Sequence, residues 1–186
     1  MIRWCFFLLL VAATASATTL QSITEDEQIQ RAQTIFRGRA EQVDTAREAT
    51  SHGNPIVTTV RFTPLAVYKG TASGLVTLRF LGGKVGDVEM KVGGMPQFHV
   101  GGEYILFVSA DGNRVCPVVG WSEGSLKVDR QTNSAGEVKA SPEVAGAAEV
   151  GVQPRSRHVL PAGTSALLPD FERRLKARIS EIGKQP

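Results

Sequence analysis

The chain has 186 residues, of which 42% are hydrophobic and 21% are charged. This composition excludes an intrinsically disordered protein and fits one globular domain with extensions. The formal net charge is +3, and the basic excess lies in residues 151–186, which hold 7 Lys and Arg against 3 Asp and Glu. These basic residues lack the interleaved aromatic residues of a nucleic-acid-binding surface, so we expect no nucleic-acid partner.

Residues 1–17 have the three-part pattern of a secretory signal peptide. Arg3 gives a positive start, an apolar run follows from Trp4 to Ala13, and Ala15-Ser16-Ala17 supplies small residues at the cleavage site. The run is about ten residues long, which is too short for a transmembrane helix. We therefore predict an exported protein, periplasmic or secreted, cleaved after Ala17. The alternative is a buried N-terminal helix.

Cys5 and Cys116 are the two cysteines of the chain. Cys5 leaves with the predicted signal peptide, so Cys116 has no partner for an internal disulfide. A lone cysteine between Val115 and Val118 is typical of a small buried hydrophobic residue rather than of a reactive thiol. We expect the domain to be stabilised by its hydrophobic core alone.

A short helix is predicted to begin at Thr24. Thr24 and Glu27 have the spacing of a capping box, and the first turn is acidic, which suits the positive end of the helix dipole. Near Gln33 the pattern changes to a strand that continues to Val43. Gly38 within this strand indicates a bulge or a close approach of another segment.

Residues 56–68 alternate between apolar and polar side chains and predict a long strand. Pro64 cannot donate a hydrogen bond to a neighbouring strand, so we expect it at an edge or at a bulge. Leu65 and Val67 are expected to return to the buried face after this irregularity.

Shorter strands are predicted around residues 76–80, 88–92, 104–108, 115–119 and 126–128. Glycine-rich turns separate them, and no helical stretch lies between them. This order favours an antiparallel sandwich or barrel over a sheet of βαβ units. We predict a mainly β fold, a partly open OB-like barrel in residues 18–130 with a leading helix.

Residues 131–165 are poor in large apolar side chains and are interpreted as a linker or strap. Residues 166–186 contain an amphipathic helix, whose stripe consists of Leu168, Phe171, Leu175, Ile179 and Ile182. We expect the stripe to pack on the barrel. The alternative is that the helix contacts a partner protein or a membrane surface through its basic face, which consists of Arg173, Arg174, Lys176 and Arg178.

The segment from Gly120 to Gly124 fits the G-x-S-x-G pattern of a nucleophile elbow. Ser122 would be the nucleophile, with His158 as the base and Asp129 or Asp170 as the acid. An elbow is followed by a helix, whereas residues 125–128 alternate like a strand. We interpret the segment as a glycine-bounded hairpin turn in a non-catalytic protein, with a serine hydrolase as the alternative.

The remaining histidines and glycines show no metal-binding spacing and no phosphate-binding loop, so we expect no metal site and no cofactor. Trp121, Phe98 and His99 are candidate binding residues because aromatic side chains on turns provide flat contact surfaces. A tryptophan in a turn is equally typical of a plug in the core.

Several motifs resemble those of a group of uncharacterised exported bacterial proteins. The motifs are Val67-Tyr68-Lys69-Gly70, Leu81-Gly82-Gly83, the segment 95–101 and the apolar strand 104–107. The chain also resembles, more distantly, the OB-like barrel of netrin and metalloproteinase-inhibitor domains. The group places Glu directly after the last glycine of segment 95–101, where this chain has Gly102 and then Glu103. Metalloproteinase inhibitors begin with cysteine, where this chain is expected to begin with Thr18.

The resemblance implies a fold and an exported location, and it carries no activity with it. We expect a non-catalytic binding module whose ligand is a protein, a peptide or a glycan, with its site near Trp121 and Phe98. Another hypothesis is an envelope-associated protein that acts through the C-terminal helix.

Overall fold

The computed structural model describes residues 23–51, 53–110, 115–130, 134–140, 160 and 164–184. Its elements in chain order are α1 (Glu25–Arg31), β1 (Ala32–Arg47), β2 (Ile56–Lys69), β3 (Val76–Leu81), β4 (Gly83–Val85), β5 (Val88–Met90), β6 (Glu103–Ser109), the 3-10 helix η1 (Trp121–Gly124), β7 (Ser125–Asp129), β8 (Glu137–Ala140), β9 (Ser165–Leu167) and α2 (Leu168–Ile182). No helix in these ranges has the length and apolar character needed to cross a membrane.

The described strands form a seven-stranded sheet in the order β3-β2-β1-β6-β7-β8-β9, and β4 pairs with β5 in a small hairpin. All of these pairings are antiparallel. The two edge strands of the sheet, β3 and β9, are not paired with each other in this order. The predicted mainly β fold, a partly open antiparallel barrel flanked by an N-terminal and a C-terminal helix, is therefore confirmed.

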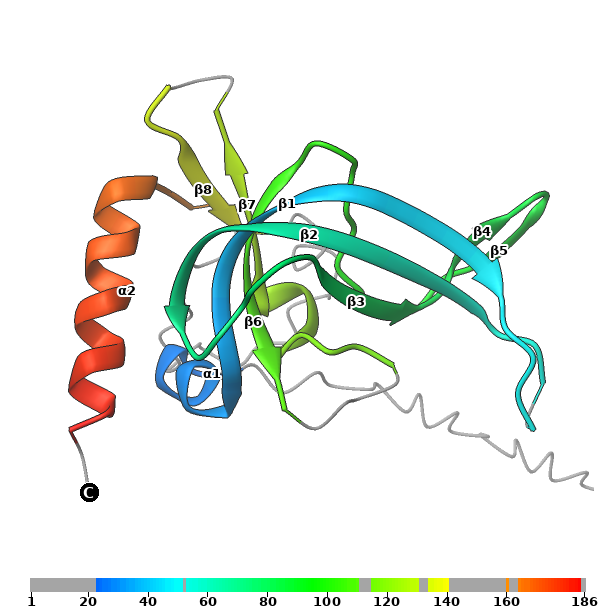
Figure 1. Ribbon diagram of the computed structural model, residues 1–186, viewed down its shortest axis with the longest axis horizontal. Coiled ribbons are helices and arrows are strands. Elements are labelled where there is room, and N and C mark those ends of the chain that lie inside the picture. The colour runs from blue at the N-terminus through cyan, green and yellow to red at the C-terminus, as the bar shows by residue number, and fades with distance from the viewer. Residues whose placement is uncertain are drawn as a thin grey trace, which may run out of the picture.

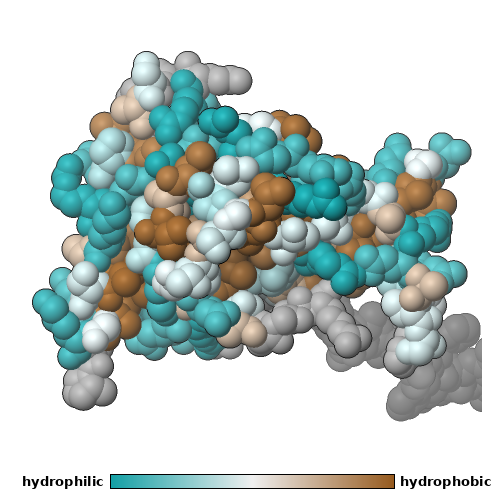
Figure 2. Space-filling view, in the orientation of Figure 1, coloured by the Kyte–Doolittle hydropathy of each residue, from teal (hydrophilic) through white to brown (hydrophobic). Residues whose placement is uncertain are grey.

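The long ribbon of β1 and β2 crosses the molecule (Figure 1). The β4–β5 hairpin lies toward one end of this ribbon, and α2 stands beside the sheet at the other end, with α1 near its foot. Figure 2 shows hydrophobic residues interrupted by hydrophilic ones over the centre of this face. The two helices therefore lie together, away from the distal end of the ribbon.

The capping box predicted for α1 is present. The Thr24 hydroxyl accepts a hydrogen bond from the Glu27 N–H, and the Thr24 N–H donates to Glu27 Oε2 at 3.0 Å. The chain turns directly into β1 at Ala32, which is extended. Ile29 and Ala32 are each 1% exposed, so α1 buries its apolar side as expected.

The two irregularities predicted in β1 and β2 lie opposite each other. Gly38 pairs with Pro64, and the register shifts between Arg37 and Gly38, leaving Leu65 as an extra residue on β2. A second shift leaves Tyr68 as an extra residue. Because each bulge inserts one residue, it changes which side chains face the core.

These bulges overturn one expectation about β2. Leu65 and Val67 are each 41% exposed, whereas the alternating pattern placed them on the buried face. Leu65 is the unpaired residue of its bulge, and Val67 follows it on the shifted register. Tyr68 instead packs against the core beneath the helices.

The buried side chains form two clusters. One cluster lies under α1 and α2 and includes Ile35, Ile105, Phe107, Leu126 and Val138. The other is built around aromatic rings and includes Phe36, Phe62, Phe80, Phe98, Tyr104, Leu106, Cys116 and Val118. Neighbouring residues of β1 and β6, such as Ile35 and Phe36, enter different clusters because successive side chains of a strand point to opposite faces.

The Tyr68-Lys69-Gly70 turn binds both helices and β1. The Tyr68 hydroxyl donates to Glu172 Oε1 of α2 at 2.6 Å. The Lys69 ammonium donates to carbonyls at the C-terminal end of α1, including that of Ala32 at 2.7 Å. Gly70 has φ +69°, and a side chain there would overlap the Gln33 carbonyl oxygen. Three consecutive residues thus join the two helices to the sheet.

The C-terminal helix packs on the sheet through the predicted stripe. Leu168, Phe171 and Leu175 are buried, and Ile179 and Ile182 pack against the same cluster. The expectation of a linker over residues 131–165 is wrong for part of this range, because β8 and β9 both belong to the sheet. Residues 131–133, 141–159 and 161–163 lie outside the described part of the chain.

A strand was also expected at residues 115–119, and the structure has none there. The segment makes one bridge, between Val108 and Val118, and Pro117 within it has no N–H to donate. Cys116 in this segment is 2% exposed, as expected for a buried cysteine. Burial raises the pKa of its thiol to about 11, which keeps the sulfur protonated and weakly nucleophilic.

Candidate functional site

The G-x-S-x-G segment forms the short helix η1 and leads into strand β7. Ser122 is 4% exposed, and its main-chain N–H donates to the Gly94 carbonyl at 3.0 Å. A side chain on Gly124 would overlap the carbonyl oxygen of Val119, so this glycine permits the tight turn. The segment is a glycine-bounded turn that hides its serine instead of presenting it.

The carboxylates considered as partners of Ser122 are both bound to lysine or arginine. Asp129 Oδ2 accepts a hydrogen bond from Lys139 Nζ at 2.9 Å. Asp170 lies on α2, is 58% exposed and forms an ion pair with Arg173 at 3.0 Å. His158 lies outside the described residues. The structure does not bring either acid into a hydrogen bond with Ser122.

Of the three candidate binding residues, Phe98 occupies different surroundings from those expected, and His99 does not. Phe98 is 8% exposed, with its ring centroid 4.9 Å from that of Phe80 and 5.3 Å from that of Phe62. It is a core residue and offers no surface for a ligand. His99 is exposed, and its main-chain N–H donates to the Tyr104 hydroxyl at 3.0 Å.

Trp121 has an unusual backbone. Its φ is 57°, the left-handed region that side-chain-bearing residues rarely adopt, and it follows Gly120 with φ 71°. The left-handed conformation costs a residue with a Cβ about 1–2 kcal/mol. Trp121 is partly buried and packs against the aromatic cluster. Strain of this kind is characteristic of functional sites, which makes Trp121 the first candidate.

A cavity of about 360 Å³ lies beside Trp121. It is lined by Arg31, Ser109, Ala110, Cys116, Val118, Val119, Gly120 and Trp121, which we call the Trp121 pocket. These residues come from the end of α1, the end of β6 and the segment that leads into η1. Gly120 lets α1 approach closely, because a Cβ there would lie 3.0 Å from Nε2 of the buried Gln28.

Sequence reasoning found Trp121 and missed Arg31. Nothing in the sequence links Arg31 to residues about 80–90 positions further along the chain. The antiparallel pairing of β1 with β6 brings the end of α1 beside Ser109, since Ala32 pairs with Ser109. A basic residue in the last turn of a helix also has an ordinary explanation, interaction with the helix dipole.

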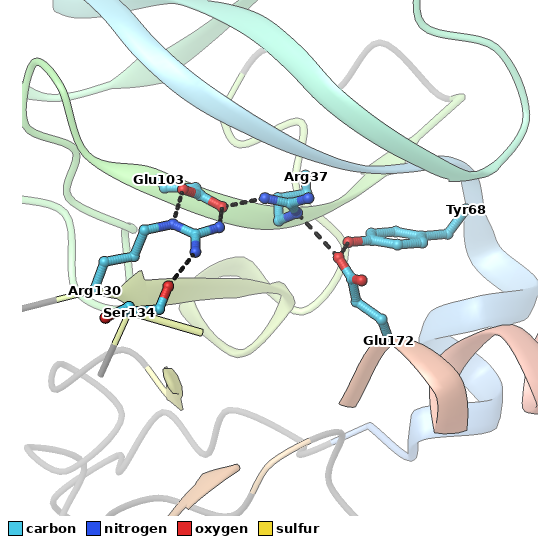
Figure 3. Close-up of polar contacts among 6 residues, drawn as sticks. All are labelled: Arg37, Tyr68, Glu103, Arg130, Ser134 and Glu172. Carbon is cyan, nitrogen blue, oxygen red and sulfur yellow. Dashed lines mark hydrogen bonds and ion pairs between the residues drawn. The ribbon is translucent and has the colours of Figure 1, made fainter. Parts of the chain in front are cut away.

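Four charged residues form a polar cluster around the buried Glu103, between the sheet and α2 (Figure 3). Glu103 is 7% exposed and accepts hydrogen bonds from Arg130 at 2.9 and 3.0 Å and from Arg37. Arg37 Nε also lies 3.0 Å from Glu172 Oε1, to which the Tyr68 hydroxyl donates. We call these five residues the Glu103 cluster. Two arginines and two glutamates balance its charge.

The register of the sheet explains how the Glu103 cluster forms. Glu103 pairs with Arg39 on one side and with Val128 on the other, so Arg37 and Arg130 lie diagonally across from it on the same face. Burial raises the pKa of Glu103, but the hydrogen bonds from Arg130 and Arg37 outweigh this effect and hold the pKa below its ordinary value. The carboxylate is ionised and its neighbours satisfy it, so the cluster ties β1, β6, β7 and α2 together.

The basic face of α2 is also largely paired within the chain. Arg178 binds Asp26 of α1 and Glu181, and Arg173 pairs with Asp170. Arg174 lies 3.8 Å from Glu25, and Lys176 lies over the ring of Tyr68 at 5.8 Å. Ion pairs between α1 and α2 therefore use part of the charge that a membrane surface would attract.

A second cavity of about 400 Å³ lies between β2 and the segment that follows it. It is lined by Thr63, Pro64, Ala72, Gly74 and Leu75. Its described lining has no charged side chain and no aromatic ring. In the described part of the chain, no group of three or more His, Cys, Asp or Glu residues is placed to hold a metal ion. Comparisons with family models, with curated proteins and with solved structures find no match to this chain.

Proposed function

We propose that this chain is an exported, non-catalytic binding module that holds its ligand in the Trp121 pocket. The observation that carries the proposal is the left-handed backbone of Trp121 beside a cavity that its side chain lines. Glycine would adopt this φ without cost, yet a large aromatic side chain occupies the position. This residue both packs against the aromatic cluster and lines the cavity.

The size of the Trp121 pocket supports one small ligand group. Ligand pockets span roughly 300–1,000 Å³ and are mostly apolar with a few polar groups. The cavity of about 360 Å³ is near the lower end of that range, and its described lining combines apolar residues with Arg31 and Ser109. It suits a compact group in place of the extended peptide or glycan that a flat surface would bind.

The two other hypotheses have less support from the geometry. A serine hydrolase would require Ser122 to leave a site in which it is 4% exposed. A protein that acts through α2 would use its basic face, and part of the charge of that face is paired with Asp26 and Glu25 of α1. Export rests on the signal-peptide pattern of residues 1–17, which lie outside the described part of the chain.

The proposal is tested by NMR with a neutral aromatic probe, 3-phenyl-1-propanol. Trp4 lies in the predicted signal peptide. In a full chain that retains this segment, the variant Trp4→Phe leaves Trp121 as the only tryptophan, so a single indole N–H signal reports on the pocket. We expect this signal to shift and saturate as the probe is added. Ala110→Phe should abolish the shift by filling the cavity, because Ala110 is exposed and lines it. Ala110→Ser is the matched control and should keep it.

An unchanged Trp121 signal at saturating probe would contradict the proposal. So would an equal shift in Ala110→Phe, because the probe would then be bound elsewhere. Circular dichroism of each variant shows whether the fold is retained.

A further inference from the structure

We infer that the natural ligand of the Trp121 pocket is a small carboxylate with an apolar body, whose anionic group is bound by Arg31. This inference rests on the proposed function, because it names the ligand class of the same pocket. It follows from the charge of the lining residues, from the way Arg31 is paired and from the chemistry of the walls.

Among the described residues that line the pocket, Arg31 is the one that carries a charge. The hydroxyl of Ser109, the other polar side chain of the lining, donates to the Pro117 carbonyl at 3.1 Å. The guanidinium is therefore the principal polar group that the described walls offer a ligand. A guanidinium favours carboxylates, because its planar fork of donors matches their two oxygens.

The acid that pairs with Arg31 among the described residues holds it weakly. Glu27 Oε1 lies 3.6 Å from Arg31 Nη2, which is beyond hydrogen-bond distance, and both side chains are largely exposed. Glu27 Oε2 is already used by the capping box with Thr24. An exposed pair of this kind contributes little and is easily exchanged for another anion.

Arg130 and Arg178 differ from Arg31, because each of them is hydrogen-bonded to a carboxylate. Arg130 binds Glu103 through two hydrogen bonds of 2.9 and 3.0 Å, and Arg178 binds Asp26 through two donors. These guanidinium groups have their carboxylate within the chain. Arg31 has no hydrogen-bonded carboxylate among the described residues, so an added carboxylate can bind it in the pocket.

The apolar lining residues indicate the chemistry of the uncharged part of the ligand. Trp121 gives an aromatic surface and the exposed Ala110 gives an apolar one, whereas Cys116 and Val118 are each 2% exposed and contribute little. Such walls favour an aromatic or short acyl group, since burial of apolar area stabilises binding. A small aryl or acyl carboxylate therefore matches both the walls and the charge.

Three probes with the same body test this inference in the Trp4→Phe chain: 3-phenylpropionate, 3-phenyl-1-propanol and 3-phenylpropylamine. We expect the carboxylate to bind about threefold to tenfold more tightly than the alcohol, and the amine to bind most weakly. Arg31→Met should remove this preference, so that the carboxylate binds no more tightly than the alcohol. Arg47→Met, an exposed arginine that is not part of the pocket, is the control and should keep it.

The outcomes separate the inference from the proposed function. If the alcohol binds but the three affinities are equal, or if Arg31→Met keeps the preference for the carboxylate, the inference is overturned and the binding site stands. If none of the probes shifts the Trp121 signal, both are overturned.

Discussion

Removing the charge of Glu103 should destabilise the protein and change its response to acid. The Glu103 carboxylate accepts three hydrogen bonds from Arg37 and Arg130. Glu103→Gln replaces it with an amide, which has one oxygen acceptor and an NH₂ group that would face a guanidinium. Glu103 is 7% exposed, so water cannot replace the lost acceptor. The substitution keeps the shape of the side chain and isolates the effect of charge.

The magnitude follows from the exposure of the partners. Breaking a buried ion pair by removing one partner costs about 3–5 kcal/mol. Arg37 is 16% exposed and keeps Glu172, and Arg130 is 43% exposed and regains water, so the cost falls to about 2–4 kcal/mol. A total stability of about 5–15 kcal/mol makes this a large fraction. Urea unfolding followed by circular dichroism near neutral pH measures it.

The pH dependence provides a second readout. Because the pKa of Glu103 in the folded protein lies below its ordinary value of 4.5, the stabilisation is fully present above that pH. It is lost as the pH falls through the folded-state pKa. The difference in unfolding free energy between the wild type and Glu103→Gln should therefore shrink on acidification below about pH 4.

Glu89→Gln is the matched control, since Glu89 pairs with Lys91 on the surface at 3.5 Å. It should change stability by less than about 0.5 kcal/mol at any pH. A cost for Glu103→Gln below about 1 kcal/mol, or a difference that persists in acid, would refute the reasoning.

Three further substitutions test the turns and the helix contacts by thermal unfolding. Gly124→Ala should cost about 2 kcal/mol or more, because its Cβ would overlap the Val119 carbonyl; an unchanged melting temperature would contradict this. Lys69→Met should cost about 1–2 kcal/mol through the freed carbonyls of α1, with the exposed Lys84→Met as a neutral control. Trp121→Gly should be more stable than Trp121→Ala by about 1 kcal/mol, since only alanine keeps the left-handed strain; the reverse order would be incompatible with it.

Local features of this fold could be predicted from the sequence because each depends on neighbouring residues. The capping box of Thr24 and the irregular sites at Gly38 and Pro64 follow from backbone chemistry, and the structure contains all of them. The faces of Leu65 and Val67 could not be predicted. Their orientation depends on where the extra residue of the bulge lies, and the sequence does not mark that position.

The candidate site could be predicted only in part, for a related reason. Trp121 is visible as an aromatic residue in a glycine-rich turn, whereas the partnership of Arg31 with it arises from the pairing of β1 with β6. The Glu103 cluster likewise joins residues 66 positions apart, such as Arg37 and Glu103, through strand register. Periodicity shows which residues are buried, but it carries no information about which distant strands become neighbours.

The most direct test of ligand binding in the Trp121 pocket is the measurement of intermolecular NOEs between 3-phenylpropionate and the Trp4→Phe chain. The account predicts NOEs from the phenyl protons of the probe to the Trp121 indole and to the methyl groups of Val118, which lines the same cavity. NOEs to Leu75 of the second cavity alone, or none to Trp121 at saturating probe, would contradict it.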